Sequence, residues 1–345
     1  MDTWGEVHPA KMNIGPDNLL YFTGGTNNRA YRVDVDGNTE VFAELPVDIA
    51  IGFTLGCQFD AAGNYYMVNG KGVFRVPADQ VTGSDTVLPV IPELFFEWPT
   101  DPETAVFIPM VIDIDTNNNV AYVSDMGRGD IWKIDLDTGV GAVWVSSQDG
   151  KDAEYGLLKG YDDSTNFLGV PFGLCEVMVD ATSEWLYFSA HERNYFGRIK
   201  IEPNGDAGAF QMLDEVEGNA ALNGAFLDKV NNKLYGAAPF LNFENGVERN
   251  PKSTRGGEIW MLDLDDVAED GSGGKAVRIL SNPDAYGTLT DVITGYGFKG
   301  ANDCDLYMLD GSFDTLEWPT GVIPDPDAAY HAAVRKFTPE GCGSS

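Results

Sequence analysis

The sequence predicts an all-β chain, folded as a six-bladed β-propeller of four-stranded antiparallel blades. Short segments of alternating apolar and polar residues fill most of the chain, and Gly, Asn and Asp turns separate them. Long amphipathic helical patterns are scarce. One unit recurs six times at a mean step of about 57 residues, a size that fits one propeller blade. Its copies are marked by Tyr21, Tyr66, Tyr122, Tyr187, Tyr235 and Tyr307.

Each unit has two halves, and the third copy shows both clearly. An apolar strand that ends at Asp115 is followed by an Asn-rich turn, the strand Ala121–Asp125 and then the strand Asp130–Asp135. A single unit cannot bury both of its faces, so neighbours must stack around an axis, with the repeated Tyr and Trp packed between blades. We predict one domain, 1–345, with approximate blades at 10–45, 50–100, 105–148, 168–215, 220–282 and 288–340.

The composition excludes several classes of protein. The chain has 345 residues, 43% of them hydrophobic, so it is not intrinsically disordered despite a net charge of −32. No apolar run approaches the roughly 20 residues that span a bilayer. A surface this acidic repels nucleic acid and anionic membranes, so neither is an expected partner. We expect a monomer that takes a small organic ligand.

The acidic residues also bear on location. Many Asp residues lie in predicted loops, which is typical of proteins that stay soluble outside the cell, and an ordinary acidic surface is the alternative. The first residues lack the basic and apolar regions of a signal peptide, so a secreted or periplasmic location implies a signal removed from this sequence.

The four cysteines do not have the spacing of a zinc site. Cys57 and Cys175 are expected to be buried free thiols. Cys304 and Cys342 are candidates for a disulfide that would join the last repeat to the C-terminal tail, and the sequence does not decide whether it forms.

Short motifs resemble a known group of propellers. Asn223–Asp228 reads Asn-Gly-Ala-Phe-Leu-Asp and Pro171–Leu174 reads Pro-Phe-Gly-Leu, similar to strings in the SMP-30/gluconolactonase-like and strictosidine-synthase-like propellers. The stretch 121–135 also resembles the yellow/major royal jelly propellers. The resemblance implies a six-bladed fold over nearly the whole chain. It does not imply one function, because the group includes lactonases, phosphotriesterases, a condensing enzyme and ligand binders.

The channel of a propeller is the usual site, and the repeat predicts which residues line it. In blades two to five, the residue five positions before the Asp that ends the inner strand is expected to face the channel. These residues are Leu55, Met110, Cys175 and Asn223. The sixth blade lacks this Asp, and we place Thr294 there; the first blade contributes Pro9 or Ala10. With Phe172, these positions predict an apolar ligand pocket composed of Leu55, Met110, Phe172 and Cys175.

The resemblance also implies one divalent cation, held by a Glu and by Asn or Asp oxygens from different blades. The candidate ligands are Asn223, Asp291 and Glu176, and calcium is the cation that prefers such oxygens. The Glu expected early in the first blade is absent, since that region reads Ala10-Lys11-Met12-Asn13. Phe172 also stands where an Asn ligand is expected. No motif for a nucleotide is present, and neither a nucleotide nor haem is expected.

Two further features are candidates for the site. His191 follows a predicted strand, and we consider it as a general base, with Glu176 as a second catalytic candidate. The tetrapeptide Glu-Trp-Pro-Thr occurs twice, and its tryptophans Trp98 and Trp318 either roof the ligand pocket or pack onto blade edges.

Three functions remain open from the sequence. The first is a lactonase or esterase-type hydrolase with its site in the central channel, assisted by a metal. The second is a metal-free binding protein or non-hydrolytic enzyme with an apolar pocket for a hydrophobic small molecule. The third is a protein-interaction scaffold that uses the acidic surface.

Overall fold

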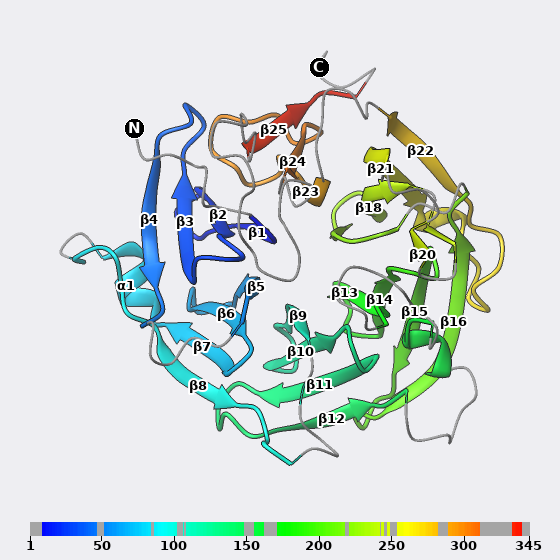
Figure 1. Cartoon of the computed structure of the whole chain (residues 1–345), viewed down its shortest axis with the longest axis horizontal. Helices are drawn as coiled ribbons and strands as arrows, with labels where there is room; N and C mark the ends of the chain where they lie inside the picture. The colour runs from blue at the N-terminus through cyan, green and yellow to red at the C-terminus, as the bar shows by residue number, and fades with distance from the viewer. Residues whose placement is uncertain are drawn as a thin grey trace.

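The computed structural model describes residues 9–46, 52–83, 86–101, 106, 108–147, 155–161, 171–217, 221–241, 243–244, 247–248, 254–281, 289–310 and 333–339. Six antiparallel sheets stand around a central axis, which confirms the predicted six-bladed propeller (Figure 1). Cys342 and Trp318 lie outside the described residues.

The first three blades have four strands each. Blade one contains β1 (Met12–Ile14), β2 (Leu20–Thr23), β3 (Arg29–Val33) and β4 (Thr39–Glu44). Blade two contains β5 (Thr54–Phe59), β6 (Tyr65–Asn69), β7 (Gly72–Val76) and β8 (Glu93–Glu97), with the short helix α1 (Ala78–Thr82) between its last two strands. Blade three contains β9 (Pro109–Asp115), β10 (Val120–Asp125), β11 (Asp130–Asp135) and β12 (Gly141–Val145).

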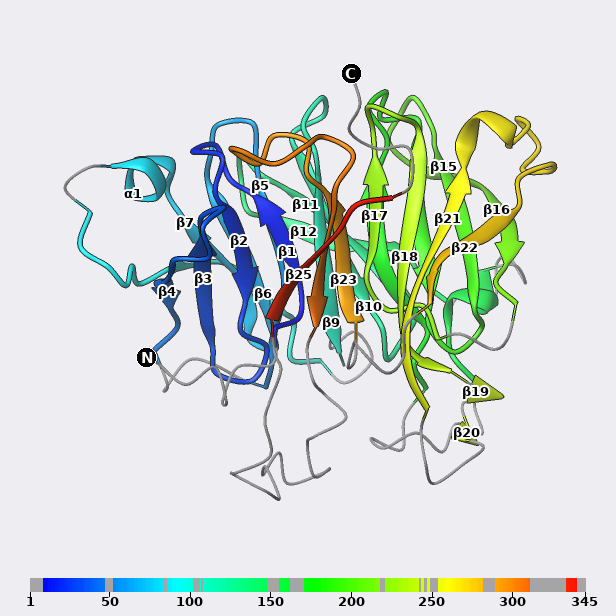
Figure 2. The same cartoon turned by 90° about the horizontal axis from the view of Figure 1, so that it is seen from above.

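The remaining blades vary more. Blade four contains β13 (Leu174–Val179), β14 (Trp185–Ala190), β15 (Tyr195–Ile201) and β16 (Ala207–Glu215). Blade five contains β17 (Ala225–Asp228), β18 (Lys233–Leu241), β21 (Thr254–Asp263) and β22 (Ala276–Ser281). The hairpin of β19 (Phe243–Glu244) and β20 (Val247–Glu248) projects from blade five toward one face (Figure 2).

Blade six differs from the prediction of four strands in every blade. Within the described residues it has three strands, β23 (Leu289–Thr294), β24 (Leu306–Asp310) and β25 (Ala333–Phe337). Cys304, just before β24, is disulfide-bonded, while Cys57 and Cys175 are buried free thiols as expected. No helix in the described part of the chain is long and apolar enough to cross a membrane.

Asp residues explain why the inner strands end where they do. Asp60 Oδ1 accepts hydrogen bonds from the backbone N–H groups of Ala62 and Asn64, both at 2.9 Å. Asp228 Oδ1 does the same for Val230 and Asn231, both at 3.0 Å. The side chain thus replaces backbone partners inside a tight turn, which is the reason Asp recurs at this position of the repeat.

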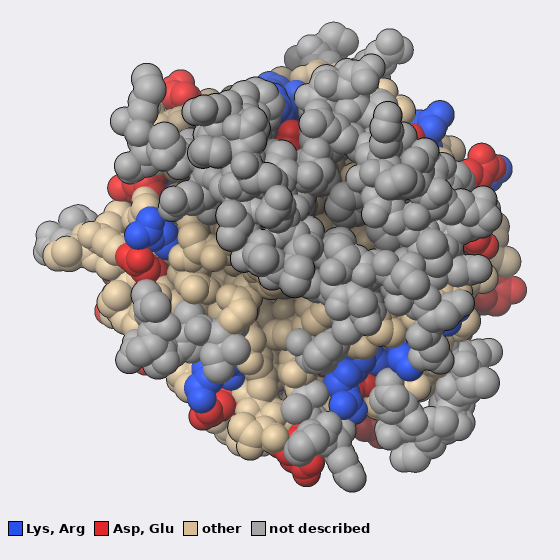
Figure 3. All heavy atoms as spheres, viewed as in Figure 1, with Lys and Arg blue, Asp and Glu red and all other residues tan. Residues whose placement is uncertain are grey.

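Aromatic side chains hold adjacent blades together. The Tyr21 ring lies 4.9 Å from Phe42 within blade one and 5.0 Å from Phe59 of blade two. Tyr122 lies 4.9 Å from Trp144 within blade three and belongs to a core cluster shared with blade four. On the face seen in Figure 3, the charged side chains of the described residues lie mostly away from the centre, and both signs occur.

Trp98 lies in the boundary between blades two and three. It is 5% exposed, its ring is 5.1 Å from Phe96 and 5.5 Å from Trp132, and its Nε1–H donates to the Asn69 carbonyl at 2.8 Å. Of the two alternatives for Trp98, this position corresponds to packing onto a blade edge rather than roofing the ligand pocket. Trp98 belongs to a core cluster separate from the one that contains Leu55 and Met110.

The packing of Trp98 predicts a large loss of stability when the ring is removed. Trp98→Ala is expected to lower the free energy of unfolding by about 3–5 kcal/mol, because it leaves a cavity and removes a buried hydrogen bond to the Asn69 carbonyl. Val140→Ala is the control, since Val140 is 69% exposed and its loss is expected to cost less than about 0.5 kcal/mol. Urea denaturation measures both. Equal stability of the two variants would contradict this role for Trp98.

Candidate functional site

A β-bulge near the start of the inner strands sets the geometry of the channel. In each of β5, β9 and β13, two residues face a single residue of the second strand of the same blade. The register of β23 against β24 shifts at the equivalent place. In blades one and five the backbone hydrogen bonds to Thr23 and Ala237 give the same two-against-one arrangement. Bulges re-aim side chains and are frequent beside functional sites.

The bulges define two layers of channel residues. We call the first residue of each bulge the first layer and the second residue the second layer. The first layer is Ala10, Leu55, Met110, Cys175, Asn223 and Thr290. The second layer is Lys11, Gly56, Val111, Glu176, Gly224 and Asp291.

One expectation about the sixth blade is corrected by this register. Thr290 stands in the first layer, and Thr294 lies four residues further along β23, at the end of the channel where the inner strands finish. Blade six has no Asp at the end of its inner strand, so its channel residue could not be counted back from that Asp as in the other blades.

The structure brings the predicted apolar pocket residues together. Leu55, Met110, Phe172 and Cys175 belong to one buried cluster with Ala10, Val111 and Met126. They lie at the end of the channel where the inner strands begin. Each of these side chains is at most 8% exposed, and we call this buried apolar group the apolar plug.

His191 and Asn223 adjoin this plug. The His191 ring lies 5.5 Å from Phe172, and its Nδ1 is 3.1 Å from the Leu222 carbonyl oxygen. Because a carbonyl only accepts, Nδ1 carries the proton, which leaves the lone pair on Nε2. Asn223 Oδ1 accepts a hydrogen bond from Cys175 Sγ at 2.9 Å. Burial lowers the pKa of His191 to about 4, so the ring is neutral at pH 7.

The second layer contains a buried ion cluster at the axis. Lys11 Nζ lies 2.9 Å from Glu176 Oε2 and 3.0 Å from Asp291 Oδ1, and it donates to the Ala225 carbonyl at 2.9 Å. Asp291 Oδ2 accepts from the Met12 backbone N–H at 2.9 Å. Blades one, four, five and six therefore meet at one ammonium group. We call Lys11, Glu176 and Asp291 the axial ion cluster.

Charge and burial compete in the axial ion cluster. Burial alone would lower the pKa of Lys11, but the negative charges of Asp291 and Glu176 outweigh it and hold that pKa above its ordinary value. Burial raises the pKa of Glu176 to about 8, against the opposing effect of Lys11. Burial also raises the pKa of Asp291. One positive charge thus faces two carboxyl groups that resist carrying two negative charges in a low dielectric.

Two glycines give the cluster its space. A Cβ at Gly56 would lie 2.7 Å from Val111 Cα, and one at Gly224 would lie 2.1 Å from the Thr290 carbonyl oxygen. Both contacts are with the backbone of the next inner strand, so neither position can carry a side chain without moving a blade. The second layer therefore has room for the long side chain of Lys11 but for no further ligand from these two blades.

The predicted metal ligands do not form a cation cage. Glu176 and Asp291 converge, but the ammonium group of Lys11 occupies the place between them. Asn223 lies one layer away and bonds to Cys175. Among the described residues, no group of three or more His, Cys, Asp or Glu side chains is arranged to hold a metal ion. The residues present therefore do not fit a divalent cation at this place.

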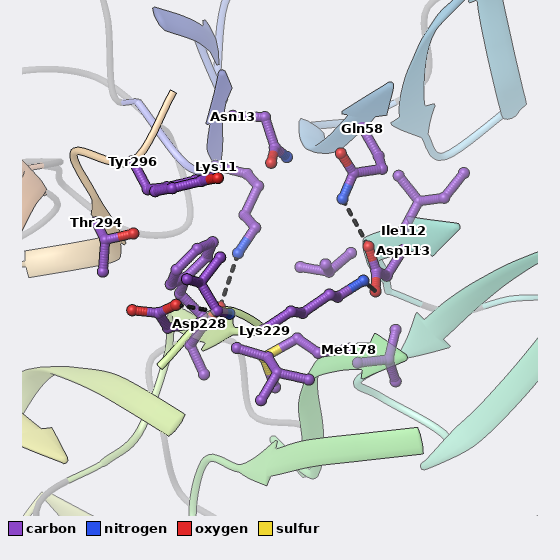
Figure 4. Close-up of a pocket in the computed structure, with 16 residues that line it drawn as sticks. Lys11, Asn13, Gln58, Ile112, Asp113, Met178, Asp228, Lys229, Thr294 and Tyr296 are labelled. Carbon is purple, nitrogen blue, oxygen red and sulfur yellow. Dashed lines mark hydrogen bonds and ion pairs between the residues drawn. The ribbon is translucent and has the colours of Figure 1, made fainter. Parts of the chain in front are cut away.

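A cavity of about 310 Å³ opens at the other end of the channel, beyond the axial ion cluster (Figure 4). Asn13, Gln58, Asp113 and Met178 line it two residues beyond the second layer. Lys11 lies at its inner end, and Val177, Leu227 and Ile112 supply apolar wall. The cavity thus combines polar groups with an apolar lining, as ligand sites do.

Hydrogen bonds between blades fix the polar lining. Asn13 Nδ2 donates to the Cys57 carbonyl at 2.7 Å, and Gln58 Nε2 donates to Asp113 Oδ1 at 2.6 Å. Asp113 Oδ2 accepts from the Val179 backbone N–H at 2.7 Å. These bonds connect blades one to four in sequence. The polar side chains of the cavity wall are therefore preorganised, because they are held in place before a ligand binds.

The rim of the cavity is the exposed part of the site. Val230 and Tyr296 line it and are 60% and 53% exposed. Lys229 reaches from the rim toward Asp113, with its Nζ 3.8 Å from Oδ2 (Figure 4). An aromatic ring, an aliphatic side chain and a cation thus stand at the mouth.

Most residues of this cavity were not predicted from the sequence. One channel residue per blade was predicted, and the residues that line the cavity follow in the same strands, at equivalent positions of the repeat. Asn13, Gln58, Asp113 and Met178 each lie three residues after a first-layer residue. Extending the repeat alignment by three positions would have found them. Lys11 stands in the region of blade one where the resemblance implied a Glu, and it was not predicted to be a channel residue.

The fold is shared with solved structures at very low sequence identity. No protein-family model matches the sequence, and no curated protein matches it. Regucalcin from Agrobacterium tumefaciens, described as a calcium-binding protein, is 11% identical over 88% of this chain and 82% of that chain, with a TM-score of 0.57. A gluconolactonase from Xanthomonas campestris is 11% identical over 89% and 84%, with a TM-score of 0.56. Virginiamycin B lyase from Staphylococcus aureus is 12% identical over 97% and 85%, with a TM-score of 0.53.

These likenesses establish the six-bladed architecture, and with it the resemblance to the gluconolactonase group at the level of fold. They do not establish an activity, because the similar structures differ in what they are described as doing.

The buried neutral His191 predicts a pH dependence of stability. Its pKa is lower in the folded protein than the ordinary 6.5, so the unfolded chain binds more protons as the pH falls below 6.5. The stability that depends on the neutral ring is present above pH 6.5 and is lost toward pH 4, by at most about 1.4 kcal/mol per pH unit. Urea denaturation at pH 7.5, 6 and 5 measures it.

His191→Phe keeps a ring of similar size and cannot be protonated. The difference in unfolding free energy between wild type and this variant is expected to shrink steadily as the pH falls. A difference that is independent of pH would show that His191 is not buried in its neutral form.

Proposed function

We propose that the protein binds a small organic molecule in its axial channel, in the cavity beyond the axial ion cluster. The cavity of about 310 Å³ carries this proposal, because it is concave, lies on the axis and mixes apolar walls with polar groups fixed by hydrogen bonds. Its rim adds the exposed Tyr296 and Lys229, which would contact the ligand first.

Calorimetry with a panel of γ- and δ-lactones and their ring-opened hydroxy acids tests this site. Tyr296→Ala and Lys229→Ala are expected to weaken the binding of any member that binds by about tenfold, or 1.4 kcal/mol. Lys275→Ala is the matched control, since Lys275 is an exposed lysine that does not line the cavity. Failure of every member to bind, or equal affinity in all three variants, would exclude this panel's chemistry from the cavity.

Hydrolysis of a lactone or ester is the activity that we propose as a second candidate, without a metal. His191 favours it, because its ring is neutral at pH 7 and lies against Phe172, which belongs to the apolar cluster with Leu55 and Met110. His191 would take a proton from water as the water oxygen attacks the ester carbonyl, and return it to the leaving alkoxide. In a similar structure, the S. aureus lyase, a histidine-to-alanine variant is described as catalytically inactive.

Glu176 has a different place in this proposal. It was a candidate both for catalysis and for metal binding, and its carboxyl group is engaged with Lys11. We assign it the positioning of the Lys11 ammonium rather than a step of the reaction.

Hydrolysis of 4-nitrophenyl acetate and of δ-valerolactone tests the second candidate. The rate is expected to be unchanged by EDTA, to fall at least about 100-fold in His191→Ala and to be retained in Tyr296→Ala. The two alanine variants therefore distinguish the two ends of the channel. Loss of the rate in EDTA, or full activity in His191→Ala, would overturn the metal-free mechanism.

A further inference from the structure

We propose that the ammonium group of Lys11 takes the place of a divalent cation at the axis of the propeller, and that removing it turns Glu176 and Asp291 into a divalent-cation site. The proposal concerns the second layer of the channel and does not depend on the ligand or the reaction proposed above.

The first argument is the convergence of oxygen atoms on one point. Glu176 Oε2, Asp291 Oδ1 and the Ala225 carbonyl oxygen lie 2.9, 3.0 and 2.9 Å from Lys11 Nζ. They come from blades four, six and five, whereas the lysine comes from blade one. Two carboxylates and a carbonyl from separate elements are the kinds of ligand that calcium takes.

The second argument is the match between an ammonium group and its site. Lys11 Nζ donates hydrogen bonds to the Ala225 carbonyl and to Asp291 Oδ1, and it forms an ion pair with Glu176 Oε2. Lys11 is 6% exposed, and Glu176 and Asp291 are 1% and 0% exposed. Two buried carboxyl groups without a counter-ion would be strongly destabilising, so some cation is required at this place.

The third argument is that no other residue of the second layer can supply a positive charge. The two glycines of the second layer are closed to side chains by the backbone of the next strand, and Val111 is apolar. Within this layer, the positive charge therefore comes either from Lys11 or from a bound ion. A covalently attached cation cannot be removed by a chelator, so the native protein should behave as metal-independent.

Thermal unfolding of the full-length protein in calcium chloride and in EDTA, at constant ionic strength, tests the proposal. A net charge of −32 will attract calcium nonspecifically, so the quantity of interest is the difference between variants and wild type. In EDTA, Lys11→Ala is expected to melt at least about 5 °C below wild type, because two buried carboxyl groups lose their counter-ion. With 5 mM calcium, it is expected to recover at least half of that loss.

Lys11→Met is the matched control. Methionine removes the charge but fills most of the same space, so this variant is expected to be destabilised without gaining a calcium response beyond that of wild type. Adding Glu176→Gln and Asp291→Asn to Lys11→Ala is expected to abolish the calcium response of that variant.

Three results would overturn the proposal. The first is a wild-type calcium response that Glu176→Gln removes, since the native site would then hold the ion. The second is a folded Lys11→Ala variant whose calcium response equals that of wild type. If Lys11→Ala does not fold, a triple variant that combines Lys11→Met, Glu176→Gln and Asp291→Asn tests the proposal instead. This neutral variant is expected to be more stable than Lys11→Met alone, and equal or lower stability is the third contrary result.

Discussion

The rest of the structure depends on the ion cluster at the axis. Lys11 crosses the channel from blade one and bonds to groups of blades four, five and six. A buried charge must be compensated, so the positions of these blades are coupled through one atom. The apolar plug lies on one side of this cluster and the cavity on the other.

Hydrogen bonds at the level of the axial ion cluster also close the ring of blades. Blade six joins blade one through the bond from the Met12 N–H to Asp291 and the bond from Thr290 Oγ1 to the Pro9 carbonyl at 2.9 Å. Between blades three and four, Ser124 Oγ donates to the Cys175 carbonyl at 2.7 Å. A bulge leaves backbone groups without their usual partners, and hydroxyl groups of adjoining blades satisfy them.

The sequence predicts the fold well because the fold is a repeat. The Asp turn that closes each inner strand fixes its register, so Leu55, Met110, Cys175 and Asn223 fall at equivalent positions. Blade six lacks that Asp, and its channel residue was misplaced by four positions. The resemblance led us to expect Glu176 and Asp291 in one site, and they do converge. The place of Lys11 between them could not be predicted, because Lys11 is 280 residues from Asp291 and a lone lysine beside a strand looks like a surface residue.

The sealing of Cys57 and Cys175 has a consequence for the covalent integrity of the chain. Burial raises the pKa of Cys57 to about 12 and places that of Cys175 well above its ordinary value, so neither forms an appreciable amount of thiolate at neutral pH. Thiol–disulfide exchange requires a thiolate with access to the disulfide. The folded protein can therefore hold two thiols and the disulfide of Cys304 in one chain without reshuffling them.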